Sequence, residues 1–283
     1  MTAFSVAINS DGSTDANFRA WITILTNIIA SAWVQTSDTG QINLATVVHP
    51  TITGANQGYQ IWRMNDSLQS TTPCYLKLEY GASTIGAYYP GIWISVGTGT
   101  DGAGNLLGSN GIRVFQYSST ANTTGTLKGS IDTNRMCLYI FYGNTSSQML
   151  FCVERTHNTA GADTSAGILC FTSGYGANSS FAIIPGITTT NNLYWNVVMP
   201  PNLTTNAWSA NVYTFPVRTW GQGETSPSTQ LLTYYTGDIT VLNPIPITTW
   251  EGVSRTFLPV GVNYNSVGYG PATTQQSVAI RYE

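Results

Sequence analysis

The chain has 283 residues, of which only 8% are charged, whereas roughly a quarter are charged in an average soluble domain. The formal net charge is −3 and the ten Lys and Arg residues are scattered singly, so no basic stripe predicts a nucleic-acid partner. Hydrophobic residues make up 42%, which is enough for a full-sized core, and neutral Ser, Thr and Asn side chains must keep the surface hydrated.

The N-terminal residues predict neither a secretory signal nor a membrane span. Residues 1–5 lack a basic region and an apolar stretch, so we expect no signal peptide. The longest apolar segment, Trp21–Trp33, is interrupted by polar residues such as Thr23 and Asn27, so we expect no membrane partner.

An amphipathic helix is predicted close to the N-terminus. Residues 11–14 form a turn rich in N-cap side chains, and Asp15 would lie favourably in the first helical turn. Apolar residues then recur at steps of three and four: Phe18, Trp21, Ile22, Leu25, Ile28, Ile29 and Trp33. We expect a helix from about Asp15 to Ala32, packed either on a sheet of this chain or on a neighbouring subunit.

Beyond Trp33 the pattern changes to short runs typical of strands, separated by clusters of Gly, Asn, Ser and Asp. Strand-like runs without intervening helices favour a mainly β fold, an antiparallel sandwich or barrel. The predicted strands are Gln41–Val48, Tyr59–Asn65, Cys74–Tyr80, Gly91–Val96, Ile112–Ser118, Met136–Tyr142, Gln148–Arg155, Gly167–Thr172, Phe181–Ile184, Leu193–Val198, Asn211–Pro216, Leu231–Tyr235 and Ile239–Leu242.

Two of these strands have informative faces. In residues 75–80, Leu76 and Leu78 alternate with Lys77 and Glu79, which predicts a strand with one solvated face. Residues 136–141 are apolar on both faces and predict a central strand covered twice. Cys137 and Cys152 are placed symmetrically about a turn and would face each other, either as a disulfide or as buried thiols.

The last part of the chain is rich in Pro and Gly. Nine prolines lie between Pro185 and Pro271, together with Gly-rich triplets. We therefore expect a looped, irregular region from about residue 185 onward. No repeat and no clean linker is visible, so residues 1–283 are interpreted as a single β-rich domain with the helix packed on its sheets.

The residues that carry chemistry are few. Residues 97–102 match G-x-G-x-x-G, but no helix pattern follows, so a loop between strands is the better interpretation. Asp101 and Asn105 in this loop suit either a turn or a Ca²⁺ site. His49 and His157 lack a positioned nucleophile, and the carboxylates are expected to pair with basic residues or to cap turns. We assign no catalytic, cofactor-binding or metal-binding residue and expect a non-enzyme.

The aromatic residues are the remaining candidates for a functional surface. Trp and Tyr combine a large apolar area with one polar tip, which suits protein contacts and stacking on sugars as well as the filling of a core. The candidate interface or glycan-stacking residues are Trp21, Trp33, Trp93, Trp220, Tyr234 and Trp250.

Several stretches in chain order resemble a family of mostly uncharacterised virion structural proteins encoded among the tail genes of tailed bacteriophages. They are Phe18–Trp21, Val34–Ile42, Gly58–Asp66, Leu76–Gly81, Pro90–Gly102, Val153–Thr156 and Ile280–Glu283. The resemblance implies a place in a virion, and it implies no catalytic or binding residues.

These observations predict a non-enzymatic structural subunit of a tailed-phage virion, made in the host cytoplasm and located in the tail, baseplate or neck region. It would assemble with itself as a symmetric homo-oligomer, and with other virion proteins, through neutral polar and aromatic contacts. The alternatives are a host-glycan-binding protein at the particle tip and a head-decoration protein. A glycosidase is the enzymatic alternative, because paired carboxylates can lie far apart in sequence.

Overall fold

The computed structural model describes residues 1–83, 86–108, 110–114, 123–142, 148–157, 163–174, 177–183, 213–221, 224–235, 243–248, 252–260 and 276–283. Every strand pair in these ranges is antiparallel. One α-helix, α1 (Asp15–Ala30), lies near the N-terminus. The mainly β, antiparallel prediction with one N-terminal helix is therefore confirmed.

Three sheets form the framework. A six-stranded sheet has the order β1 (Thr2–Asn9), β9 (Thr124–Asp132), β10 (Arg135–Phe141), β11 (Gln148–His157), β12 (Asp163–Gly174) and β13 (Ala177–Ile183). A five-stranded sheet has the order β2 (Val34–Gln35), β3 (Asn56–Arg63), β4 (Tyr75–Ser83), β5 (Gly86–Gly97) and β8 (Asn110–Val114). Another five-stranded sheet has the order β14 (Tyr213–Gly221), β15 (Glu224–Tyr235), β18 (Gln276–Arg281), β17 (Ser254–Val260) and β16 (Ile245–Thr248).

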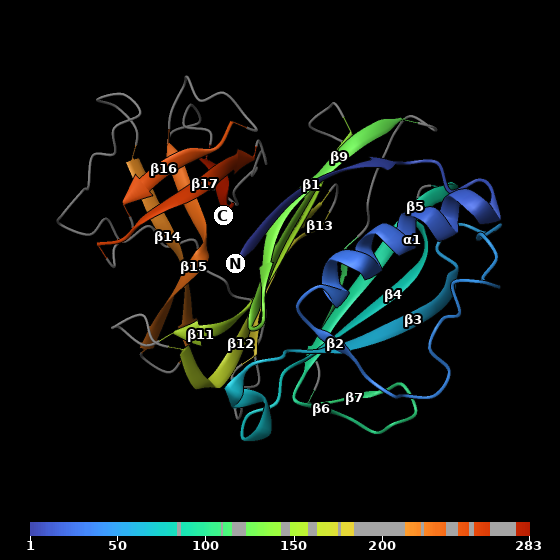
Figure 1. Cartoon of the computed structure of the whole chain (residues 1–283), viewed down its shortest axis with the longest axis horizontal. Helices are drawn as coiled ribbons and strands as arrows, with labels where there is room; N and C mark the ends of the chain where they lie inside the picture. Colours follow the sequence, from blue (N-terminus) through green and yellow to red (C-terminus); the bar gives the residue numbers. More distant parts are fainter. Residues whose placement is uncertain are drawn as a thin grey trace.

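The six-stranded sheet is the middle layer (Figure 1), with the sheet of β2–β5 and β8 on one side and the sheet of β14–β18 on the other. β10 lies inside the middle sheet, between β9 and β11. Its residues Met136, Leu138 and Ile140 join a large core with α1 and the β2–β5 sheet, whereas Cys137 and Tyr139 join a smaller core with Leu258, Val260 and Ile280. The predicted central strand covered on both faces is confirmed.

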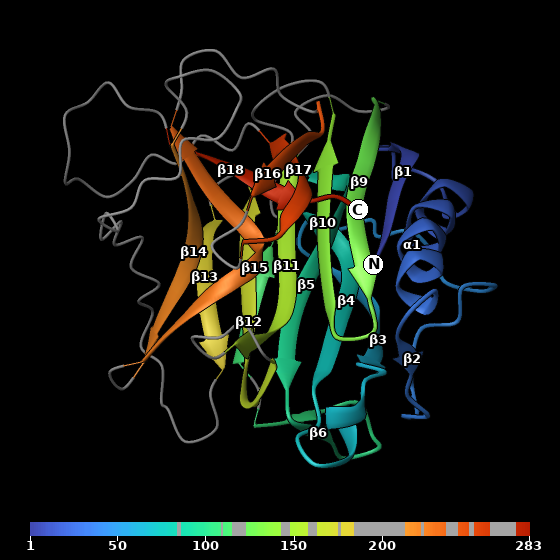
Figure 2. The same ribbon diagram turned by 60° about the vertical axis from the view of Figure 1, so that its left-hand side comes forward.

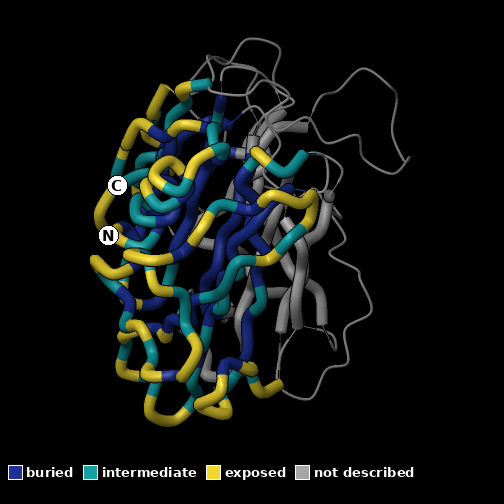
Figure 3. The backbone as a smooth tube through the Cα atoms, turned by 90° about the vertical axis from the view of Figure 1, so that its right-hand side faces the viewer, coloured by how far each residue is buried: buried dark blue, intermediate teal, exposed yellow. Residues whose placement is uncertain are grey.

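Residues 75–80 follow the other predicted face pattern. Leu76 and Leu78 are fully buried, while Lys77 and Glu79 are half-buried on the opposite face of β4. Buried segments run through the interior of the molecule, and exposed ones gather at the turns (Figure 3). Alternation in the sequence thus reports which face of this sheet meets the core.

The helix α1 begins where a side chain can cap it. The Thr14 hydroxyl accepts a hydrogen bond from the Asn17 N–H at 3.2 Å, which satisfies one of the unpaired donors of the first turn. The helix ends at Ala30, two residues before the predicted end, and it runs beside β1 (Figure 2). Its apolar stripe is buried in the larger core. The stripe therefore packs within this chain, and the alternative of a stripe docked on another subunit is wrong.

The predicted strand Gln41–Val48 is wrong, because Asn43 organises a turn there. The Asn43 side-chain oxygen accepts the Ala45 N–H at 2.9 Å, and its carbonyl accepts the N–H groups of Thr46 and Val47. Such local bonds compete with strand pairing. Two other predicted strands, Leu193–Val198 and Ile239–Leu242, lie outside the described residues. Three more are described only in part: Ile112–Ser118 to residue 114, Phe181–Ile184 to residue 183, and Asn211–Pro216 from residue 213.

From about residue 185, where a looped region is expected, the described residues form the sheet of β14–β18, which includes the described part of the predicted strand Asn211–Pro216 and the predicted strand Leu231–Tyr235. The prolines lie where a ladder bond is not needed. Pro216 and Pro246 lie in the two edge strands, β14 and β16. Pro259 lies in the inner strand β17, beyond the residues of that strand that pair with β16. Pro227 lies in the inner strand β15, beyond the residues of that strand that pair with β18. Proline is tolerated at such positions because it has no N–H to donate.

Other short elements connect the sheets. A 3₁₀-helix, η1 (Ser67–Ser70), links β3 to β4, and a small hairpin of β6 (Gly99–Thr100) and β7 (Leu106–Leu107) links β5 to β8. Within the described ranges, no helix has both the length and the hydropathy that a bilayer crossing requires.

Candidate functional site

The structure places three of the six candidate aromatic residues in the interior. Trp21, Trp33 and Trp93 are 1%, 2% and 8% exposed. The Trp21 indole N–H donates to the Tyr142 hydroxyl at 3.3 Å, and the Trp33 indole N–H donates to the Asp132 carbonyl at 2.8 Å. These side chains fill and fix the core, so their assignment as exposed interface or glycan-stacking residues is wrong.

The structure does not gather the other three candidates into one site with the three buried tryptophans. Trp220 lies in β14 opposite Thr225, and Tyr234 lies in β15 opposite Ser277. Trp250 lies outside the described residues. Because three of the six stacking candidates are buried, the glycan-binding alternative has less support from the structure than it has from the sequence.

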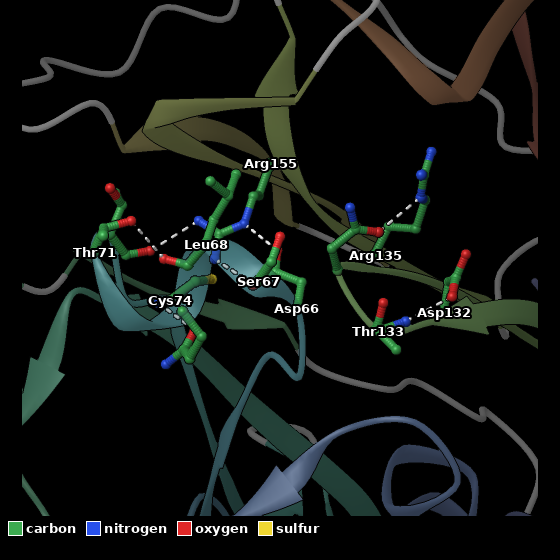
Figure 4. Close-up of polar contacts among 12 residues, drawn as sticks. Asp66, Ser67, Leu68, Thr71, Cys74, Asp132, Thr133, Arg135 and Arg155 are labelled. Carbon is green, nitrogen blue, oxygen red and sulfur yellow. Dashed lines mark hydrogen bonds and ion pairs between the residues drawn. The ribbon is translucent and has the colours of Figure 1, made fainter.

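A buried ion pair between Arg155 and Asp66 lies beside the larger core (Figure 4). The Arg155 side chain, 1% exposed, extends from β11 toward η1 and binds both carboxylate oxygens of Asp66. Its Nε donates to Oδ2 at 2.5 Å, and its Nη2 donates to Oδ1 at 2.8 Å. Its Nη1 donates to the Thr72 carbonyl at 2.9 Å. The planar guanidinium fork matches a carboxylate in this way, so the pair fastens the β3–β4 connection to the middle sheet.

Cys74 lies next to this pair and does not act as a reactive thiol. Burial raises the pKa of Cys74 far above its ordinary value, against the opposing effect of Arg155. Since the thiolate is the nucleophilic form, Cys74 is inert at neutral pH. Cys137 and Cys152 lie directly opposite each other in β10 and β11, as predicted, and both are buried thiols rather than a disulfide.

A second ionic group lies beside the smaller core, and we call it the rim cluster: Arg135, Glu154, Arg255, Arg281 and Glu283. Arg281 Nη2 and Arg255 Nη1 lie 2.6 Å and 3.6 Å from Glu283 Oε1. The Thr256 N–H donates to Glu283 Oε2 at 3.1 Å. Burial, with Arg255 and Arg135 nearby, lowers the pKa of Arg281. Among the described residues, Nη1 of Arg281 has no hydrogen-bond partner.

The two histidines have structural positions. His49 Nδ1 lies 2.6 Å from Asp15 Oδ1, and the same oxygen accepts the His49 N–H at 2.9 Å. The hydrogen bonds from His49 lower the pKa of Asp15, and Arg19 adds to this effect. His157 ends β11, opposite Asp163 of β12. The pairing of His49 with Asp15 holds the 43–50 loop against the start of α1.

The glycine-rich segment lies between the longer strands β5 and β8, as predicted, and includes the short strand β6. The Asp101 carboxylate accepts the N–H groups of Ala103 and Asn105 at 2.8 Å and 3.0 Å, and the Asn105 amide at 2.7 Å. Gly104 has φ +95°, and a Cβ on it would lie 2.0 Å from the Tyr59 hydroxyl oxygen, so glycine is required there. Asp101 therefore serves as a turn residue in this loop, which is one of the two roles, turn or Ca²⁺ site, that the sequence suggests.

Taken together, these groups tie segments of the chain to one another. Asp66 and Glu283 each bind an arginine, and Asp101 organises a turn, as expected for most carboxylates. Among the described residues, no three His, Cys, Asp or Glu side chains form a group that could hold a metal ion. The sequence did not single out Asp66 or Arg155 as a pair, because the two are far apart in the chain and carry no local motif.

Comparisons with known proteins found no match: neither a protein-family model, nor a curated protein, nor a solved structure is similar to this chain.

Proposed function

We propose that the chain is a non-enzymatic structural subunit of a tailed-phage virion, located in the tail, baseplate or neck region. The observation that carries the proposal is how the few charges are used. Only 8% of residues are charged, and charged groups pair inside the chain, at Asp66–Arg155, Asp15–Arg19, Lys77–Glu79 and Arg281–Glu283. Much of the surface left for partners is neutral.

A neutral surface supports assembly rather than catalysis. General acid–base and nucleophilic catalysis need ionisable groups within reach of a substrate, and the described ionic side chains named above bind one another or the backbone. Contacts between neutral surfaces are little affected by added salt, because screening acts on charges. The resemblance of seven stretches to virion structural proteins encoded among phage tail genes points to the virion as the place of assembly.

Two measurements test the proposal. Light scattering of the purified chain over a range of concentrations should show a symmetric oligomer whose dissociation constant changes by less than about threefold between low and molar salt. Electron microscopy of intact particles, with the chain labelled by an antibody, should place it in the tail, baseplate or neck. A monomer at every concentration, absent from the particle, would contradict the proposal; label on the head would favour the head-decoration alternative.

A further inference from the structure

The outer edge of β1 lacks the usual protection against pairing. β1 is the terminal strand of the six-stranded sheet and pairs only with β9 among the described strands. Its eight residues, TAFSVAIN, include no charged residue and no proline, and its register with β9 has no bulge. Edge strands in natural proteins usually carry a Lys, a Pro or a bulge that prevents addition of another strand. This edge is therefore suited to receive one.

The hydrogen bonds of β1 identify the backbone groups that point outward. The Ser10 N–H donates to the Thr123 carbonyl at 3.0 Å, which extends the β1–β9 register by one pair. Bonded pairs alternate along an antiparallel ladder, so Phe4 and Val6 bond to β9, while Ala3, Ser5 and Ala7 direct their N–H and C=O groups away from it. No other described backbone group bonds to these three residues, and all three are exposed.

We propose that β1 pairs antiparallel with β1 of a second copy of this chain, about a twofold axis at Ser5. This names the surface of the homo-oligomer and rests on the assembly function proposed above. The Ser5 N–H of each copy would donate to the Ser5 carbonyl of the other, and Ala3 would pair in the same way with Ala7 of the second copy. The middle sheets of the two copies would then form one continuous sheet. Such a contact is isologous, because the same groups are used on both sides.

The side chains of β1 are complementary to their own copy in this register. Pairing centred on Ser5 places Phe4 opposite Val6 of the second copy, and such cross-strand apolar pairs stabilise a sheet. Val6 is 36% exposed in the single chain and would be covered. On the other face, only Ala and Ser side chains meet. Because β1 carries no charge, the twofold axis brings no like charges of this strand together, which favours a second copy as the occupant.

The helix α1 forms the surface beside β1. α1 runs alongside β1 (Figures 1 and 2). Its exposed positions include Ala16, Ala20, Asn27 and Ala30, which are small and uncharged. The charged side chains of this helix, Asp15 and Arg19, are 41% and 31% exposed and lie 3.5 Å apart, so a second copy that approached them would meet an ion pair and not a lone charge.

Substitutions at Ser5 test the pairing without disturbing the chain's own sheet, since the Ser5 N–H does not bond to β9. Ser5→Pro removes both central hydrogen bonds, and Ser5→Lys or Ser5→Asp places like charges opposite each other. By sedimentation, each variant should raise the dimer dissociation constant about fivefold or more. An equimolar mixture of Ser5→Lys and Ser5→Asp should recover the dimer, because opposite charges then face each other. The matched control is Thr53→Lys, in an exposed turn outside β1, which should dimerise normally.

The outcomes separate this inference from the proposed function. Circular dichroism and melting temperature verify that each variant is folded. If the wild type is oligomeric and all Ser5 variants remain so with unchanged affinity, the β1 inference is overturned while the assembly function stands. If the wild type is a monomer alone but enters particles, and Ser5→Pro prevents entry whereas Thr53→Lys does not, the edge binds a different protein and the second-copy inference is overturned. Recovery of the dimer in the mixture of Ser5→Lys and Ser5→Asp, and not in either variant by itself, supports a twofold axis at Ser5.

Discussion

β10 sends alternate side chains into two cores, and the ionic groups beside these cores differ. On the side of the larger core, all three guanidinium nitrogens of Arg155 have an acceptor, two from Asp66 and one from Thr72. On the side of the smaller core, Arg281 shares Glu283 with Arg255, and one of its nitrogens has no partner among the described residues.

The difference indicates how each group acts on the fold. The charge that each loss would leave behind differs in burial: without Asp66 it is Arg155, 1% exposed, whereas without Glu283 it is Arg281 and Arg255, 9% and 20% exposed. A fully buried charge that loses its partner cannot be compensated by water, but a partly exposed one can be in part. The Asp66–Arg155 pair therefore acts as a fixed clamp between η1 and β11, and the rim cluster should tolerate change better.

The largest expected effect is the loss of this clamp. Asp66→Ala leaves Arg155 charged, buried and without its carboxylate, so the free energy of unfolding should fall by about 3–5 kcal/mol. Urea denaturation measures this loss, and Glu283→Ala provides the comparison from the rim cluster, with a smaller expected loss. The double variant Asp66→Ala/Arg155→Met should recover most of the stability, because no unpaired charge remains. Equal losses from Asp66→Ala and Glu283→Ala would remove the distinction between the two groups.

A second pair of variants compares the cores themselves. Leu138 and Leu258 are both fully buried, one in each core. Each substitution to Ala should cost about 2–5 kcal/mol, with the larger loss at Leu138. A cavity there lies between a helix and two sheets and cannot collapse easily, whereas the smaller core has fewer layers to hold it open. Urea unfolding measures both losses, and a greater loss for Leu258→Ala would show that the smaller core is the more tightly constrained one.

The sequence predicted the elements whose pattern is set by a single buried face. The apolar stripe Phe18–Trp33 predicted α1, and the alternation in residues 75–80 predicted the two faces of β4. In both cases burial of one face sets the spacing of the apolar residues. The strands β1, β9, β16, β17 and β18 were missed, as were the two-residue strands β2, β6 and β7. In β9 the reason is Gly129: a Cβ there would lie 1.9 Å from the Cys137 carbonyl oxygen and 2.8 Å from Phe4, so glycine is needed for packing in a strand where propensity disfavours it.

The candidate site was predicted less well than the fold. Aromatic residues suit an interface and a core equally, and the sequence does not state which of these surrounds Trp21, Trp33 or Trp93. The Asp66–Arg155 pair and the outward groups of β1 both depend on strand order, which brings residues 89 positions apart into contact and leaves β1 at an edge. Strand order follows from the whole set of pairings and not from any local motif.

The smallest expected effect is a pH dependence from the rim cluster. Although burial raises the pKa of Glu283, the hydrogen bonds from the Thr256 N–H and Arg281 outweigh it and lower the pKa below the ordinary 4.5. The folded state therefore binds this proton less readily than the unfolded state. The resulting stability is fully present above about pH 4.5 and is lost as the pH falls through the folded pKa.

Glu283→Gln should accordingly flatten the fall in unfolding free energy between about pH 5 and pH 3, measured by urea denaturation at each pH. Asp38 has a lowered pKa as well: burial raises it, but the hydrogen bonds from the Thr100 hydroxyl and the Gly104 N–H outweigh that effect. Asp38→Asn, in a distant loop, should flatten the same fall independently, so that the double variant shows the sum of both changes. An unchanged slope in Glu283→Gln would mean that Arg281 and Arg255 do not hold this carboxylate in its charged form, and that the rim cluster contributes packing rather than charge pairing.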